Sequence, residues 1–153
     1  DDLSRGLGDV YKRQVLEHCL AGFTDPEASV DARDRLAGVL IDGGAASVPH
    51  IVDGFGPASS AADDELRALL RAISDAAVDG LAAAYEKSGW LEKVSAGLVS
   101  RHNNRRVQIA RVLGEIRTRK SIKVLKALLK REREDNLRLQ LERVLHAAGG
   151  SGE

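Results

Sequence analysis

Several residue types are scarce in this chain of 153 residues. Aromatic residues make up 3% of it, methionine is absent, and there is a single cysteine, Cys19. One cysteine excludes an intramolecular disulfide framework. With so few aromatic residues, a core must be built from Leu, Val, Ile and Ala, which are suited to packing between helices. The composition therefore favours a helical protein.

Long apolar runs are also absent. No stretch approaches the roughly 18 apolar residues that a membrane-spanning helix needs, and no apolar segment precedes a small-residue cleavage site. These absences predict a soluble protein without a membrane partner, and the cytoplasm is the default expectation. Because the sequence has no initiator methionine, a signal peptide could have been lost with a missing N-terminal segment.

The net charge is zero, but the two halves of the chain differ in sign. Residues 15–100 contain six Lys and Arg against fourteen Asp and Glu, a balance of −8. Residues 101–146 contain fourteen against five, a balance of +9. Such asymmetry between halves indicates an interaction surface.

The stretch DVYKRQ, residues 9–14, is the in-frame translation of the transposase mosaic end used in sequencing-library preparation (GAT GTG TAT AAG AGA CAG). We interpret this match as a cloning or assembly scar and not as a targeting signal. We therefore expect that residues 1–14 do not belong to the native protein. The natural segment is expected to begin near Val15, part-way through a longer protein.

Internal similarity predicts an array of related units. The stretch NRRVQIARVLGEI (104–116) aligns with NLRLQLERVLHAA (136–148), with six identities in thirteen positions at an offset of 32. ARDRLAGVLIDGG (32–44) fits the same template, and ELRALLRAISDA (65–76) fits it more loosely. Four copies at spacings of roughly 32 to 40 residues predict repeated two-helix units.

Each copy is predicted to form a helix with one apolar face, because positions such as Val107, Ala110 and Leu113 recur every three residues. A second helix should follow each copy, at 47–52, 77–87 and 121–131. Helix starts are predicted from candidate N-caps, and glycine pairs mark the stops. The candidate starts are Asp25-Pro26-Glu27, Asp63, Asn104 and Asp135 or Asn136, and the stops are Gly43-Gly44 and Gly149-Gly150.

Two segments depart from this pattern. Residues 15–23 are predicted to be the tail of a further second helix whose partner is missing, so that its apolar face (Val15, Leu16, Leu20 and Phe23) should be partly bare and promote oligomerisation. The connection 88–103 is long enough for an extra turn or short helix. We expect Trp90 to pack over it, and the alternative role for Trp90 and Tyr85 is an interface hot spot.

The stretches DPEASVDARDRLAGVLIDGGAASVPHIVDGF (25–55) and RRVQIARVLGEIRTRKSIKVLKALLK (105–130) resemble bacterial HEAT-like repeats. Leu113-Gly114-Glu115-Ile116, in the place of the family's Leu-Gly turn, and Ala46-Ser47-Val48-Pro49 carry the match most clearly. The resemblance implies an all-α α-solenoid of about four two-helix units over residues 15–148, with the first and last incomplete. A flexible tail is expected at 149–153. In such families the second helices line the concave side, which commonly holds the partner.

The predicted second helix at 121–131 is the one candidate partner-binding site. If Ile122, Leu125 and Leu128 face the core together with Leu129, the lysines between them fall on the exposed face. The alternative interpretation is a solvated helix face whose field is weakened by Glu132, Glu134 and Asp135. The candidate basic face consists of Lys123, Lys126 and Lys130, extended by Arg119, Lys120, Arg101 and Arg105.

The sequence contains no nucleophile elbow, phosphate-binding loop or dinucleotide fingerprint. His18 is adjacent to Cys19, and His50, His102 and His146 lie far apart, so no histidine has metal-ligand spacing. We therefore expect no catalytic residue, no cofactor and no metal.

The leading hypothesis is a non-catalytic HEAT-like scaffold or regulatory segment that binds another protein, for which an acidic surface is the best match. The alternative is binding of a nucleic-acid phosphate backbone through residues 101–146. No aromatic residue interleaves these cations, which argues against stacking on single-stranded bases. A third hypothesis, an enzyme of the bilin-lyase type, is supported only by the repeat itself.

Overall fold

The structure is a computed structural model that describes residues 2–94 and 99–149. Within these residues the chain forms helices joined by short connections and contains no strand, so the predicted all-α class is confirmed. None of the helices described is long and apolar enough to cross a membrane. The elements are α1 (Asp2–Phe23), α2 (Val30–Asp42), the 3-10 turn η1 (Gly44–Ser47), α3 (Val48–Asp53), α4 (Ala61–Ile73), α5 (Asp75–Val94), α6 (Val99–Ile116), α7 (Arg119–Arg131) and α8 (Asp135–Ala147).

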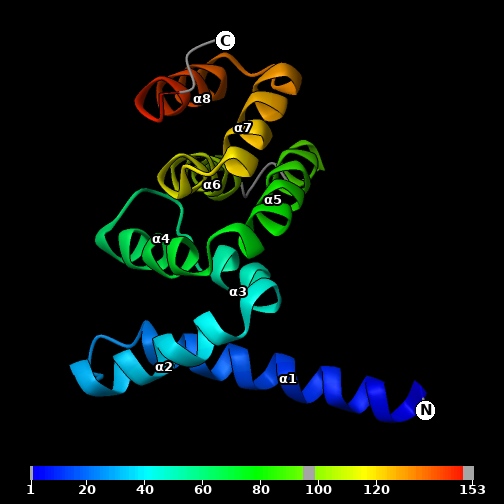
Figure 1. Ribbon diagram of the computed structural model, residues 1–153, viewed down its shortest axis with the longest axis vertical. Coiled ribbons are helices and arrows are strands. Elements are labelled where there is room, and N and C mark those ends of the chain that lie inside the picture. The colour runs from blue at the N-terminus through cyan, green and yellow to red at the C-terminus, as the bar shows by residue number, and fades with distance from the viewer. Residues whose placement is uncertain (1, 95–98, 150–153) are drawn as a thin grey trace.

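The helices lie in two columns along the long axis of the molecule (Figure 1). One column holds α2, α4, α6 and α8, each in contact with the next, and the other holds α3, α5 and α7. Helices that are adjacent in sequence, such as α5 and α6, contact each other between the columns. Helix α1 packs on α2 and α3 at one end of the molecule, and α8 lies at the other end.

A single cluster of buried apolar side chains extends from α1 to α8. It consists mainly of Leu, Ile, Val and Ala, as the composition predicts. Leu40, Leu113 and Leu145, which occupy the same position in three copies of the repeat, are all buried. Burying such a side chain contributes about 1.5–3 kcal/mol, so contacts between helices supply much of the stability of the fold.

Helix α1 has one half that packs and one half that does not. Every residue from Gly8 to Gln14 is exposed, and this half of α1 extends beyond the other helices (Figure 1). In contrast, Leu16 and Phe23 are buried. The predicted bare face is therefore wrong for these two residues, because α2 and α3 contact α1 and cover them.

The helix starts differ from the predicted N-caps. Ser29 caps α2 and Ser60 caps α4, each through a side-chain oxygen that accepts an N–H of the first turn. Glu134 does the same for α8. Asp63 and Asn104 lie inside α4 and α6 instead, because their side chains are used in contacts between these helices.

The long connection at 88–103 does not form a separate short helix in the part that the structure describes. Helix α5 continues to Val94 and α6 begins at Val99, so longer helices account for most of it. Residues 95–98 lie outside the described residues. Trp90 is 62% exposed, so the prediction that it packs over this connection is wrong.

Gly114 marks a close approach of α6 and α8. A Cβ atom at this position would lie 2.4 Å from Cγ1 of Val144. The Leu113-Gly114 step was expected to form a turn, but it lies inside α6, which ends at Ile116. The packing therefore requires glycine here because it has no side chain, and not because the backbone turns.

Replacing Gly114 with alanine should lower the midpoint of thermal unfolding. Overpacking typically costs about 1–3 kcal/mol, which exceeds the gain in helix propensity of about 1 kcal/mol. Adding Val144→Ala to the same chain should recover much of the loss, because it removes the atom that the new methyl group would meet.

Gly38→Ala is the matched control, since no atom lies within 4 Å of a Cβ at Gly38 in α2. This substitution should raise the midpoint through helix propensity alone. A midpoint for Gly114→Ala at or above that of the parent chain would contradict the close packing of α6 and α8.

Candidate functional site

Helix α7 carries the central residues of the predicted basic face. Leu125 and Leu128 are buried, whereas Lys123 and Lys130 are exposed. Arg119 is exposed and Lys126 is partly buried. Positions 119, 123, 126 and 130 are separated by four, three and four residues, so they follow one another along a single face of the helix. We call Arg119, Lys123, Lys126 and Lys130 the α7 stripe.

The residues predicted to widen this stripe do not all join it. Lys120 Nζ lies 3.1 Å from Oδ2 of Asp79 on α5, which draws it to the side of α7. The side chain of Arg105 is 12% exposed, and its Nη1 lies 3.6 Å from Oδ1 of Asp53. The side chain of Arg101 lies outside the described residues. The basic face is thus narrower than the sequence predicted.

Part of the charge asymmetry between the two halves of the chain is used within the fold. Besides the pair of Lys120 and Asp79, Arg131 Nη1 lies 2.5 Å from Oε1 of Glu86, so cations of α7 meet carboxylates of α5. Exposed pairs of this kind contribute about 0–1 kcal/mol each. Their main effect is to fix which residues of the two helices face each other.

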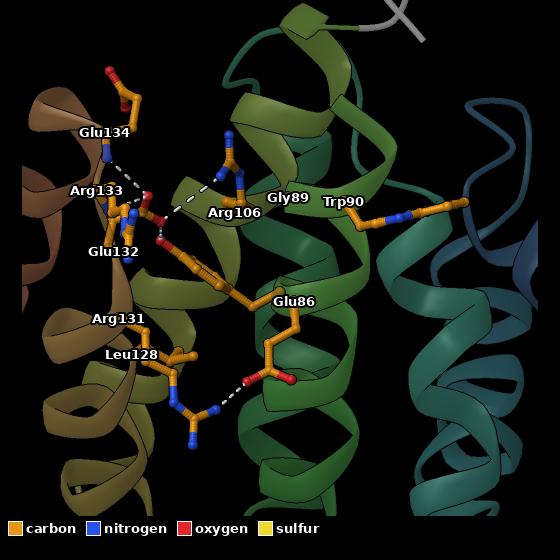
Figure 2. A pocket seen from close by; sticks show the side chains of 10 residues that line it. Glu86, Gly89, Trp90, Arg106, Leu128, Arg131, Glu132, Arg133 and Glu134 are labelled. Carbon is orange, nitrogen blue, oxygen red and sulfur yellow. Dashed lines mark hydrogen bonds and ion pairs between the residues drawn. The ribbon is translucent and has the colours of Figure 1, made fainter. Parts of the chain in front are cut away.

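A pocket of about 680 Å³ opens between α5, α6 and the linker that joins α7 to α8. The linker residues form one side, and Trp90 extends from α5 on the side away from the linker (Figure 2). The sequence indicated Tyr85 and Trp90 as candidate interface residues but did not predict a cavity beside them. The pocket is lined by Tyr85, Glu86, Gly89, Trp90, Arg106, Leu128, Arg131, Glu132, Arg133 and Glu134.

Glu132 holds the inner part of this pocket together. Its Oε1 accepts a hydrogen bond of 2.5 Å from the Tyr85 hydroxyl and lies 3.7 Å from Nη1 of Arg106 (Figure 2). The side chains of Arg106 and Glu132 are 7% and 9% exposed. The guanidinium carbon of Arg106 also lies 5.9 Å from the centre of the Tyr85 ring. A buried carboxylate needs such partners to remain charged.

The same carboxylate fixes the linker. Oε2 of Glu132 accepts the backbone N–H groups of Arg133 and Glu134, both at 3.1 Å. Glu134 in turn accepts the N–H groups of Asn136 and Leu137 at the start of α8. The linker conformation is therefore set by side chains of its own two glutamates, one of which is anchored on α5.

Burial raises the pKa of the Tyr85 hydroxyl well above its ordinary value of 10.0, and the hydrogen bond to the Glu132 carboxylate and its charge raise the pKa further. The Arg106 cation acts in the opposite direction but is a smaller effect. The hydroxyl therefore remains a protonated donor at neutral and mildly alkaline pH.

A second buried polar cluster joins α4 to α6. Nδ2 of Asn104 donates to the carbonyl oxygen of Gly56 at 2.7 Å and to Oδ2 of Asp63 at 3.1 Å. Nε2 of Gln108 donates to Oγ of Ser59 at 2.9 Å. These groups hold the loop before α4 against α6, so we assign them a structural role.

The histidines do not form a site. His18 and His146 are exposed and His102 is buried, while Nδ1 of His50 lies 3.9 Å from Oε1 of Glu17. Among the residues described, no group of His, Cys, Asp and Glu could hold a metal ion.

No protein-family model, curated protein or solved structure matched this chain. The resemblance to HEAT-like repeats therefore stays a prediction from the sequence. The features of the molecule that bear on function are the arrangement of the helices, the α7 stripe and the pocket.

Glu132→Gln should lower the free energy of unfolding by about 3 kcal/mol, because it removes the carboxylate that faces the buried Arg106. Tyr85→Phe should cost about 1 kcal/mol, since it removes one hydrogen bond. Urea denaturation followed by circular dichroism measures both. Glu142→Gln is the control, because Glu142 is exposed on α8. Equal effects of the Glu132 and Glu142 substitutions would contradict the proposed buried contact.

The raised pKa of Tyr85 predicts a loss of stability at high pH. Below about pH 10, the ordinary tyrosine pKa, folded and unfolded chains both keep the proton, so the contribution is fully present. As the pH rises further the unfolded chain loses the proton first, and stability falls. The near-ultraviolet absorbance of phenolate follows the ionisation of Tyr85, and circular dichroism over the same pH range reports unfolding.

Tyr85 should ionise only when the chain unfolds, and Tyr85→Phe should remove this late step. If the phenolate absorbance that Tyr85→Phe removes appeared while circular dichroism still showed a folded chain, the Tyr85 hydroxyl would be accessible to water and not held by Glu132.

Proposed function

We propose that this chain is part of an α-solenoid of HEAT-like two-helix repeats that acts as a non-catalytic scaffold or regulatory segment by binding another protein. The observation that carries the proposal is the order of helix contacts. Helix α2 contacts α4, α4 contacts α6 and α6 contacts α8, while α3 contacts α5 and α5 contacts α7. Contact with the helix two positions further is what stacked two-helix units produce.

The length of the molecule supports the same proposal. Helices α1 and α8 lie at opposite ends of the long axis (Figure 1), so the two columns present extended faces to a partner. Leu139 on α8 is 43% exposed, as expected where a stack of helices could continue. Extended faces of this kind are the binding surfaces of repeat proteins.

The α7 stripe supports an acidic partner. Arg119, Lys123 and Lys130 project from one face of a helix whose opposite face is buried in the core. A row of cations attracts a surface of opposite charge, raises the rate of association and disfavours basic partners.

The same stripe also favours the alternative, binding of a nucleic-acid backbone. Each phosphate that is neutralised releases counterions and increases the dependence of affinity on salt. The stripe is short, however, because Lys120 and Arg105 are directed to Asp79 and Asp53. We therefore rank protein binding first.

The combined substitution Lys123→Glu and Lys130→Glu should reduce binding of the protein partner by about tenfold or more, which corresponds to about 1.4 kcal/mol. The chain is used to capture partners from nuclease-treated extract of its source cells, and captured proteins are identified and then remeasured in purified form. Lys87→Glu with Arg143→Glu is the control, because it makes the same change of charge at exposed positions outside α7.

A purified protein that binds the parent chain and the control, but binds the α7 variant weakly, supports the proposal. Without nuclease, a shift of duplex DNA that weakens steeply with salt and is lost in the α7 variant, together with no protein captured, would replace it with the nucleic-acid alternative.

A further inference from the structure

Most of the charged groups that line the pocket beside Trp90 contact another group of the protein. Arg106 faces Glu132, and Arg131 is paired with Glu86. Both oxygens of Glu134 accept N–H groups at the start of α8. These contacts account for all three carboxylates of the pocket and for two of its three cations.

Arg133 is the remaining cation. Its backbone N–H donates to Glu132, but its side chain is exposed and, within the described part of the chain, has no ion pair or hydrogen bond. The lining as a whole is neutral, with three carboxylates and three arginines, and Arg133 is the one charged side chain among them without a partner. A carboxylate of a ligand would pair with Arg133 and leave the contacts of Glu132 unchanged.

The pocket also has apolar surface. Trp90 is largely exposed, and Gly89 beside it adds no side chain to the wall of the pocket. A Cβ at Gly89 would lie 3.4 Å from Nη1 of Arg106, an ordinary contact. Leu128 adds apolar surface from α7. An exposed tryptophan next to a pocket can bury a large apolar area on binding, and tryptophan is enriched at binding hot spots.

We propose that this pocket binds an extended acidic peptide segment of a partner protein, with a carboxylate at Arg133 and an apolar side chain against Trp90. The inference rests on the proposed function and names the segment that is recognised. Arg133 lies on the linker side and Trp90 extends from α5 away from the linker (Figure 2), so a ligand that reaches both is elongated. A peptide supplies the two groups from different residues of one chain.

The α7 stripe lies apart from this pocket. Positions 119, 123, 126 and 130 share one face of α7, whereas Leu128 and Arg131, the residues of α7 that line the pocket, lie on another.

Trp90 provides a direct test because it is the only tryptophan in the chain. The full chain is titrated with a synthetic peptide of alternating glutamate and leucine, and with a peptide in which lysine replaces glutamate. The glutamate peptide should produce a saturable change in tryptophan fluorescence, and the lysine peptide should not. No saturable change with the glutamate peptide, or equal responses to both, would overturn the proposal.

Arg133→Gln should weaken binding of the glutamate peptide about tenfold, the loss expected for one charge-assisted contact. Arg143→Gln, an exposed arginine of α8 outside the pocket, should leave it unchanged. Gly89→Leu should block the pocket, whereas Gly89→Ala should still bind. Circular dichroism confirms that each variant is folded, and equal affinity of the parent, Arg133→Gln and Gly89→Leu would refute the pocket as the site.

The Lys123→Glu and Lys130→Glu chain separates this proposal from the proposed function. In this variant the glutamate peptide should still change the tryptophan fluorescence, and its affinity should fall less than it does in Arg133→Gln. If the protein partner depends on the α7 stripe while Trp90 does not respond to the glutamate peptide, the scaffold function stands and the pocket proposal fails.

Discussion

Burial of aliphatic side chains between helices two positions apart is the constraint on which the rest of the structure depends. Aromatic residues make up 3% of the chain, and the core is a long, mainly aliphatic cluster reaching from α1 to α8. Each helix is stable because a neighbour covers its apolar side. The exposed faces are then available for other purposes, and the α7 stripe and the pocket both lie on them.

Polar contacts determine how the helices are aligned. In one column Arg67 and Arg71 of α4 both bind Glu115 of α6, at 2.8 and 2.6 Å. In the other, Thr118 donates to Asp75 at 2.5 Å. Apolar packing alone specifies the relative position of two helices less uniquely than packing combined with charged and hydrogen-bonded pairs. The opposite charges of the two halves of the chain thus contribute to the alignment as well as to the surface.

The sequence predicted the helices better than it predicted their contacts. The periodic apolar positions around Leu40 and Leu113 located the buried faces, because burial follows directly from helical spacing. The caps were misplaced where serine and aspartate compete within one turn, since Asp63 is used by Asn104 on another helix. The pocket could not be predicted, because Tyr85 and Glu132 are 47 residues apart and only the stacking of α5 on α7 brings them together. The exposure of Trp90 depends on the same tertiary arrangement.

Glu132 affects how α8 separates from the other helices when the chain unfolds. A helix that has neighbours on one side only commonly frays. The backbone N–H groups of the linker between α7 and α8 donate to the Glu132 carboxylate, which also accepts the hydrogen bond of the Tyr85 hydroxyl. Helix α8 therefore cannot detach without moving this linker. Separation would expose a buried arginine and a tyrosine on earlier helices. The last helix is therefore coupled to α5, and the C-terminal half should open as one cooperative unit.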